Sequence, residues 1–392
     1  MKKVLATILA LVMALGLTTA AWADDAGVTC NGENCTHQAA IGSTHYDTLI
    51  AAVADVADGG EVTLLRDVPN GVGIGTYANP SEGQIQSKSF TINFNGKTYT
   101  LKSEPVGSAG YESQGFHLEA KAGESTKVVF MNGTINIAEN CEGNMTMLIQ
   151  NYCDLTLDNM VVDGRNLKDA FYKQSDGSLK QGPNYTLSNN SNNAAKTAIK
   201  DTEIVARITG NFANVAFDSD KTSEVSVEGS SVITGNIEVS ATAKLAVFSG
   251  IFTTDVTSYI KTDSPRATVK DKNGETVYAV GASNIAEAAT AGSTVEITYG
   301  ENVELTGIPT GVTVKNSTGK DISINGSTVT AGTSYTVPAR YYYYNSTTTT
   351  TDTKTTDTKG SPKTFDAGIA LYVGMALTSA AGVAFVGKKR ED

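Results

Sequence analysis

The chain has 392 residues and a formal net charge of −11 at pH 7, from 41 acidic and 30 basic side chains. An acidic surface excludes nucleic acid and anionic lipid as partners, because binding to phosphate depends on Lys and Arg. The 38 Gly residues and the recurrent Asn, Thr, Ser and Val are typical of a β-rich protein with many turns. We therefore predict an all-β fold.

The N-terminus has the three parts of a secretory signal peptide. A basic head, Lys2-Lys3, precedes an apolar region, and an Ala-Trp-Ala sequence then supplies the small-x-small pattern that signal peptidase cuts. We predict a signal peptide over 1–23, with cleavage between Ala23 and Asp24. The first cysteine lies well beyond the apolar region, which argues against a lipoprotein.

The leader segment, 24–46, holds Cys30, Cys35, His37 and His45. These four side chains could close a tetrahedral zinc site, but their spacing is not that of a standard zinc finger. In an exported segment a local Cys30–Cys35 disulfide is at least as reasonable, and two free thiols are the third alternative. We take the disulfide as the working prediction and predict no metal site.

The next segment predicts a helix over 47–57. Asp47 is the expected N-cap, and the apolar residues after it recur at helical spacing: Leu49, Ile50, Val53 and Val56. Gly59 and Gly60 end the helix, and 61–65 predicts a strand.

Short strand-like runs, each ending in a small turn residue, follow over most of the chain. The turn positions are Asn95, Asn132, Asp158, Asp201, Glu228 and Ser249. A strand and turn that recur at roughly 20 to 30 residues are the signature of a solenoid, in which every strand pairs with its counterpart one coil away. The longer interval between Asp158 and Asp201 would then be two steps. Asn and Ser at the turns are expected to stack as side-chain ladders.

Two sequences carry a resemblance to a known family: YDTLIAAVADVADGGEVTLLRDV at 46–68 and FTINFNGKTYTL at 90–101. They resemble the opening of adhesin-like surface proteins of Gram-positive bacteria with a pectin-lyase-type right-handed parallel β-helix, and the resemblance covers about 46–260. It implies a β-helix domain over 47–262, whose first coil is capped by the helix at 47–57 so that its open edge is protected. An array of β-sandwich modules is the alternative.

Proteins of this fold include many carbohydrate-cleaving enzymes, so we searched for their chemistry. Hydrolysis needs two carboxylates held across one sugar bond, and the lyases use a Ca²⁺ carboxylate cluster with a basic residue. The candidates are Asp158, Asp163 and Arg165, together with Asp218 and Asp220. They form no dense cluster, and the signatures of the related hydrolases are missing. We predict no catalytic residue and no cofactor.

Three further residues were weighed as chemical groups. His117 is isolated in an apolar strand, which predicts a hydrogen-bonded wall residue rather than a catalytic one. Cys141 and Cys153 are about half a coil apart, so they are not expected to stack directly, and a disulfide across a turn is the alternative.

The helix–Gly–strand pattern returns near the C-terminus, with a helix at 285–289 and a strand at 294–298. It predicts a small β-rich module with one helix over 263–339. The Tyr- and Thr-rich segment that follows, 340–360, has too little apolar area to offset the ordering of its chain. We predict that this segment is a disordered stalk.

The last segment, 361–392, resembles a sortase sorting signal. Residues 367–387 carry no charge and are long enough to cross a bilayer, and the basic run 388–390 marks the cytoplasmic end. The pentapeptide before them is Ser361, Pro362, Lys363, Thr364 and Phe365.

In the sortase family this pentapeptide is Leu-Pro-x-Thr-Gly, so Pro362 and Thr364 match while Ser361 and Phe365 depart. The resemblance implies that a sortase transpeptidase cuts after Thr364 and joins its carbonyl to peptidoglycan. A plain transmembrane anchor is the alternative.

These features predict a non-catalytic surface protein at the cell wall, held in the plasma membrane by its C-terminal segment before processing. Its function would be adhesion, with host or microbial glycans or surface proteins as partners. Two alternatives stay open: a polysaccharide lyase or glycoside hydrolase, and a structural wall or pilus component.

Overall fold

The computed structural model divides the chain into two compact units, Met1–Val337 and Pro338–Asp392. It describes 36–339 except 109–111, 122, 174, 183, 191–194, 208–214 and 219–222. The predicted signal peptide, the Cys30–Cys35 disulfide, the stalk and the sorting signal all lie outside the described residues. None of the helices formed by the described residues is long and apolar enough to span a membrane.

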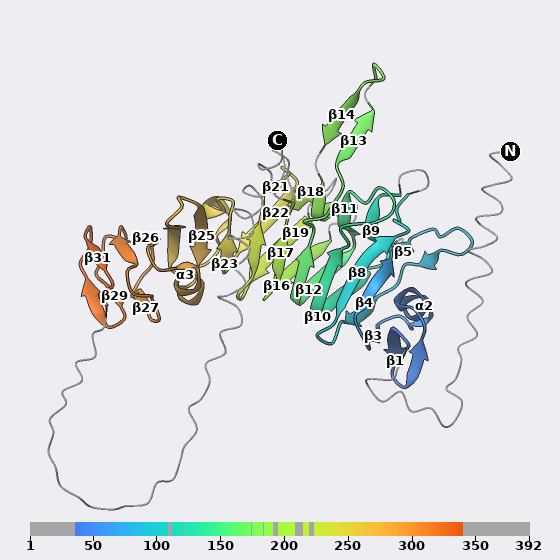
Figure 1. Cartoon of the computed structure of the whole chain (residues 1–392), viewed down its shortest axis with the longest axis horizontal. Coiled ribbons are helices and arrows are strands. Elements are labelled where there is room, and N and C mark those ends of the chain that lie inside the picture. The colour runs from blue at the N-terminus through green and yellow to red at the C-terminus, as the bar shows by residue number, and fades with distance from the viewer. Residues whose placement is uncertain are drawn as a thin grey trace, which may run out of the picture. The chain divides into compact units, whose positions relative to one another are not determined.

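Parallel strands stack in three rows, and the chain visits the rows in turn (Figure 1). We call one passage of the chain through the rows a coil. In the first row each strand pairs in parallel with the next: β3 (Gly60–Leu64), β7 (Phe90–Asn93), β10 (Lys127–Ile137), β12 (Asp154–Asp163), β16 (Lys196–Lys200), β19 (Ser223–Glu228) and β22 (Ala243–Val247).

The second row uses the C-terminal halves of β10 and β12 and has the same parallel pairing. Its other strands are β4 (Val68–Val72), β8 (Thr98–Ser103), β17 (Glu203–Val205), β20 (Val232–Thr234) and β23 (Gly250–Phe252).

The third row is a separate parallel sheet of seven strands. In spatial order they are β6 (Ile85–Gln86), β5 (Ile74–Tyr77), β9 (Gln114–Glu119), β11 (Met147–Tyr152), β15 (Tyr185–Asn190), β18 (Val215–Asp218) and β21 (Ile237–Val239). The prediction of a mainly β protein with parallel strands is therefore confirmed.

Left-handed residues turn the chain from the first row into the second in the coils that contain β7, β10, β12, β16 and β19. These residues have positive φ: Asn95, Asn132, Asn159, Asp201 and Gly229. Asn, Asp and Gly tolerate this conformation better than other residues. The turns predicted at Asn95, Asn132 and Asp201 are therefore confirmed, whereas those predicted at Asp158 and Glu228 each lie one residue later. At the predicted turn Ser249 the positive φ, 134°, likewise falls on the next residue, Gly250.

Asparagine side chains join these turns into the expected ladder. Asn132 Nδ2 lies 3.4 Å from Asn93 Oδ1, and Asn159 Nδ2 donates to Asn132 Oδ1 at 3.1 Å. A second, buried ladder runs at the corner after the third row, where Asn151 Nδ2 donates to Asn189 Oδ1 at 2.6 Å.

The interval between Asp158 and Asp201 is one coil, not two. β12 pairs directly with β16 and β17, so no further coil lies between them. The additional residues include an antiparallel hairpin of β13 (Ala170–Lys173) and β14 (Leu179–Gly182), which projects from the stacked strands (Figure 1).

A hairpin and a helix cover the first coil. β1 (Ala39–Ile41) pairs antiparallel with both β2 (Thr44–Tyr46) and β3, and α2 (Leu49–Asp55) follows. The N-cap of α2 is Thr48, whose Oγ1 accepts a hydrogen bond from the Ala51 N–H at 3.2 Å. The prediction of Asp47 as N-cap is wrong by one residue, because both neighbours are good capping residues and only the helix position separates them.

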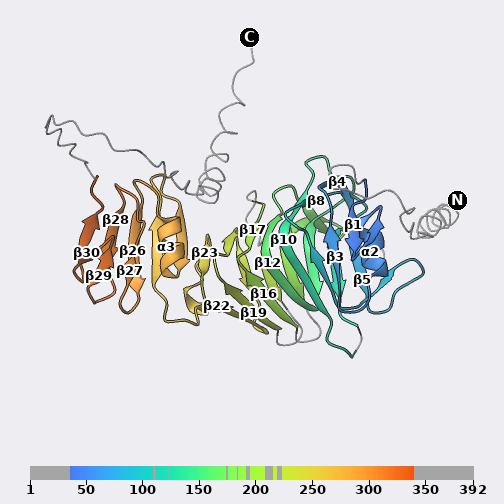
Figure 2. The same cartoon turned by 90° about the horizontal axis from the view of Figure 1, so that it is seen from below.

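The last coil leads into a small module with its own core. Its α3 (Ala282–Ala288) and β26 (Thr294–Tyr299) confirm the helix–Gly–strand prediction (Figure 2). The other elements of the module are β24 (Arg266–Lys270), β25 (Thr276–Val280), β27 (Glu304–Leu305), β28 (Thr313–Asn316), β29 (Ile322–Ile324), β30 (Ser327–Val329) and β31 (Ser334–Thr336). The short η1 (Thr257–Tyr259) precedes it and packs on the first core. β26 pairs in parallel with β28 and β27 with β29, so parallel stacking resumes on a smaller scale.

Candidate functional site

His117 on β9 is held inside the wall of the third row. Its Nδ1 lies 2.5 Å from Gln114 Oε1, and its Nε2 lies 2.9 Å from Glu119 Oε1. Its ring stacks on Tyr77 at 5.0 Å between centroids, and Tyr152 lies 5.3 Å away on the next strand. The side chain is only 1% exposed. The prediction of a hydrogen-bonded wall residue is confirmed.

Glu119 is bound through both of its carboxylate oxygens. The hydrogen bond from His117 lowers the pKa of this carboxyl, and the Ala78 N–H, which donates to Oε2 at 2.7 Å, adds to the effect against the cost of burial. The group therefore stays ionised at neutral pH, and it cannot serve as a proton donor there.

Both carboxylate oxygens of Asp163 accept hydrogen bonds from Arg165, two residues later in the chain. Arg165 donates from Nε to both carboxylate oxygens at 3.0 Å and from Nη2 to Oδ2 at 2.5 Å. Glu203 on β17 pairs laterally with Val161 of β12, which lies two positions before Asp163 on the same face of that strand. Burial raises the pKa of Glu203, and the negative charge of Asp163 raises it further. Sequence reasoning missed this second carboxylate, because only the strand register brings it beside Asp163.

The remaining acidic candidates do not lie beside Asp163 and Glu203. Asp158 lies on the first row, opposite Lys200, whereas Asp163 lies on the second row. The backbone of Asp218 belongs to β18 in the third row, but its side chain and the whole of Asp220 lie outside the described residues. The predicted candidates thus belong to different faces of the stacked strands.

The thiols and the leader histidines form no reactive centre among the residues described. Cys141 and Cys153 are buried free thiols, and burial raises the pKa of each, so both stay protonated and inert. The rings of His37 and His45 meet edge to face at 5.4 Å. Within the described ranges, no three His, Cys, Asp or Glu side chains are placed to hold a metal ion.

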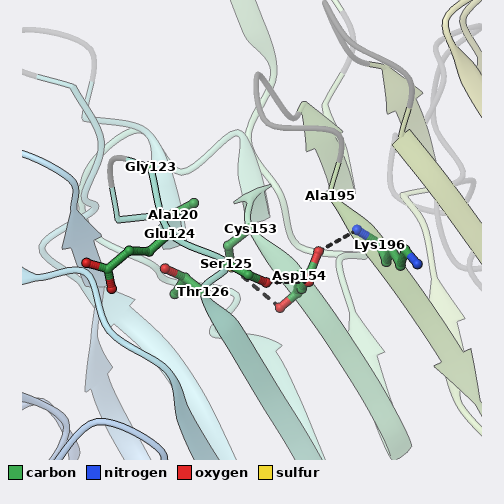
Figure 3. Close-up of a pocket in the computed structure, with 9 residues that line it drawn as sticks. All are labelled: Ala120, Gly123, Glu124, Ser125, Thr126, Cys153, Asp154, Ala195 and Lys196. Carbon is green, nitrogen blue, oxygen red and sulfur yellow. Dashed lines mark hydrogen bonds between the residues drawn. The ribbon is translucent and has the colours of Figure 1, made fainter.

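A groove of about 420 Å³ lies where the third row leads back into the first (Figure 3). It crosses three successive coils. Three small buried residues, one from each coil, leave the space for it: Ala120, Cys153 and Ala195. The side chains of Glu124, Ser125, Thr126, Asp154 and Lys196 also line it.

Asp154 ties the three coils of the groove together. Its Oδ2 accepts a hydrogen bond from Ser125 Oγ at 3.0 Å, and its Oδ1 accepts one from the Lys196 N–H at 2.6 Å (Figure 3). Two flexible charged groups flank it. The Lys196 side chain is 74% exposed, 3.8 Å from Glu224, and Glu124 pairs with Lys121 at 2.8 Å.

The groove therefore offers a hydroxyl, carboxylates and an ammonium group on a concave surface. Such groups bind ligands rich in hydroxyl or amide groups through hydrogen bonds. The groove could not be predicted from the sequence, because its lining comes from three segments that only the strand register brings together.

Comparisons with protein-family models, with characterised proteins and with solved structures find no match to this chain.

Proposed function

We propose that the three parallel rows form one right-handed parallel β-helix. Three features support this winding: the chain visits the rows in a fixed order, the coils that contain β7, β10, β12, β16 and β19 turn at a left-handed residue, and α2 with β1 covers the first coil. Closing the first coil in this way removes an edge that would otherwise pair with other chains.

On this scaffold we propose a non-catalytic cell-surface protein that recognises glycans or surface proteins by adhesion. The observation that carries this proposal is the polar groove across three coils, lined by Ser125, Asp154 and Lys196. A rigid stack of strands suits the binding of extended chains, because its coils repeat the same polar positions along one line.

The surroundings of the acidic candidates favour recognition over catalysis. A hydrolase needs one protonated and one ionised carboxyl across a substrate bond. Asp163 is instead engaged by the fork of Arg165, and Glu119 by His117 and the backbone. A polysaccharide lyase or glycoside hydrolase remains the second candidate, since Glu203 with its raised pKa lies near Asp163.

The termini support display at the cell wall. The proposed route is export by the signal peptide 1–23, a pause at the membrane through 367–387, and transfer of the Thr364 carbonyl to a cross-bridge amine of peptidoglycan by a sortase. Thr364→Ala should leave the protein in the membrane fraction. Mass spectrometry of wall fragments would then find no peptide that ends at residue 364, whereas recovery of wild-type protein intact through Asp392 would indicate a plain membrane anchor.

A glycan array with the full chain purified in detergent tests recognition directly. We expect binding to a limited set of glycans, reduced by the double change Glu124→Ala and Lys196→Ala in the groove. Lys244→Ala is the matched control, because Lys244 lies on the same face two coils from Lys196 and outside the groove. Equal loss in the control, or cleavage of a uronate-containing glycan by the wild type, would contradict the proposal.

A further inference from the structure

Tyr299 is an exposed aromatic residue at a distortion of the small module. It ends β26 and lies opposite Arg266, the first residue of β24, where the register shifts between Arg266 and Ala267. A β-bulge of this kind redirects a side chain away from the regular alternation of a strand. The Tyr299 side chain is 38% exposed.

The ring of Tyr299 is fixed on one face and at its edge. The guanidinium carbon of Arg266 lies 4.2 Å from the ring centroid, and Tyr299 Oη donates to Asp263 Oδ1 at 3.0 Å. Arg266 is itself held, because its Nη2 donates to the Thr262 carbonyl at 3.0 Å. Guanidinium contact and the hydroxyl bond together hold the ring in one orientation before any ligand arrives.

Charged groups of both signs surround the free part of the ring. Asp263 and Glu301 are close enough to raise the pKa of the Tyr299 hydroxyl, the hydrogen bond to Asp263 being the larger cause. Lys320 Nζ pairs with Glu301 at 2.7 Å, and the positive charge of Arg266 and the negative charge of Asp263 both lie against the Tyr299 side chain. Arg266 also keeps a buried Nε without a hydrogen-bond partner. The place therefore carries hydrogen-bonding groups with little net charge.

We propose that Tyr299, with Asp263 and Arg266, is a stacking platform for the pyranose ring of an uncharged sugar. A partly exposed aromatic ring, 38% accessible and held on one face by Arg266, suits the C–H face of a sugar, and the nearby Asp263 carboxylate suits its hydroxyls. The balanced charge favours an uncharged ligand over an acidic or a basic one, because a charged ligand would find no compensating excess of the opposite sign.

The other large exposed apolar side chains in the described part of the chain lack this support. They are Phe171, Leu179 and Phe248, and Arg266–Tyr299 is the cation–π contact found among the described residues. Single exposed apolar residues are common on protein surfaces and need no ligand. The fixed orientation, the bulge and the balanced charges distinguish Tyr299 from them.

This site is separate from the groove beside Asp154. Tyr299 belongs to the module whose buried residues form a second core, whereas the groove is lined by coils of the first core. Failure of the groove variants on a glycan array therefore leaves the Tyr299 platform untouched, and the reverse also holds.

Saturation-transfer difference NMR with the full chain tests the platform, because it detects weak ligands whatever the size of the protein. The probes are glucose, galactose, mannose and N-acetylglucosamine, each at millimolar concentration. We expect at least one to receive magnetisation, and Tyr299→Ala to weaken its binding by roughly tenfold, the loss expected for one aromatic contact. Tyr299→Phe keeps the ring but loses the bond to Asp263, so its effect should be smaller.

Phe248→Ala is the matched control, since Phe248 is similarly exposed, at 42%. Unchanged thermal midpoints in Tyr299→Ala and Phe248→Ala would show that any loss reflects the binding surface rather than unfolding. The proposal is overturned if no sugar receives magnetisation from the wild type, if Tyr299→Ala binds as the wild type does, or if Phe248→Ala loses binding equally.

Discussion

At the scale of single residues, the histidine and the carboxylates considered as catalytic candidates form hydrogen bonds with neighbouring side chains of the protein. His117 joins Gln114 and Glu119 between two tyrosine rings, and Asp163 accepts a three-bond fork from Arg165. Each pair satisfies groups that would otherwise be costly to bury. These residues therefore stabilise the wall of the fold, and the groups left for ligands are those of the groove and of the Tyr299 platform.

Glu119→Gln is expected to make the free energy of unfolding depend less on pH in the acid range. The folded state holds the pKa of Glu119 below the ordinary value of 4.5 for a glutamate. This carboxylate therefore stabilises the fold above that pH, and the contribution is lost as the pH falls through the lowered pKa. Urea unfolding between pH 3 and 7 would measure the change. The exposed Glu304→Gln is the control, and an equally flat profile in that variant would refute the assignment.

Sequence reasoning found His117 but only part of its environment. His117 and Glu119 alternate on one strand, so their shared face follows from the period of two. Tyr77 and Tyr152 come from the coils before and after, and their contact with the ring depends on the register of three strands. The same limit hid Glu203 from the analysis of Asp163, because no local pattern places residues from separate coils side by side.

At the scale of elements, charges alternate from coil to coil along the outer face of the first row. One line of laterally paired residues is Lys127, Asp154, Lys196, Glu224 and Lys244. A second line runs through Asp158, Lys200 and Glu228, where Lys200 Nζ lies 3.0 Å from Glu228. Opposite charges on neighbouring strands favour this register over slipped ones.

Glu228→Lys should destabilise the stacked strands by placing two lysines side by side. The expected loss is about 1 kcal/mol, since exposed pairs contribute little and a like-charge pair adds repulsion. Chemical denaturation in urea at low and high salt would measure it, and the difference from wild type should shrink as salt rises. Glu228→Gln removes the attraction without the repulsion and should fall between the two, so a loss independent of salt would point to another cause.

The capping elements were the best predicted, and the hairpin β13–β14 was the worst. The helix over the first coil follows from its apolar spacing and its Gly-Gly end. The sequence predicts two coils between Asp158 and Asp201 and no hairpin, because a longer interval between turns fits either two coils or one coil with an insertion. Strand pairing separates the two possibilities, and the interval alone does not.

Changing Leu49 and Val53 of α2 to Asp should open the first coil. Both side chains are fully buried in the large core, and a buried unpaired carboxylate is strongly unfavourable. We expect α2 to detach and β3 to lose its cover, so that the chain aggregates through that edge. Light scattering and sedimentation would detect the aggregates. Ala54→Asp and Asp58→Asn, both at exposed positions of the same segment, serve as controls. Equal aggregation in these variants would argue against a capping role.

At the scale of the whole described unit, two cores meet at one junction. The buried residues of the stacked rows form the first core, and those of the module with α3 form the second. β25 pairs antiparallel with β23, which turns the last open strand of the second row into the start of the module. The module thus covers the last strand of the second row, as β1 covers the first strand of the first row, so these two edges are protected from pairing with other chains.

Asn284 of α3 links the two cores through its side-chain amide. The residue is 2% exposed, and its Nδ2 donates to the Gly229 carbonyl at 3.1 Å and to the Val280 carbonyl at 2.8 Å. Gly229 is a left-handed turn of the stack, so this bond joins the helix of the module to a coil of the larger core. Gly229 is exposed, so its carbonyl can bind water once the amide is gone, and Asn284→Ala should cost about 1 kcal/mol, the net value of an ordinary hydrogen bond.

Because that cost falls on the junction, Asn284→Ala should weaken the coupling of the cores more than either core. We expect one calorimetric transition in the wild type to become two in the variant, and faster proteolysis within 253–265, between β23 and β24. Asn316→Ala is a matched control, since Asn316 is equally buried but its Nδ2 donates to Lys320 and Val329 inside the module. That change should lower the stability of the module without separating the transitions. A single, merely shifted transition in Asn284→Ala would show that β23–β25 pairing alone couples the cores.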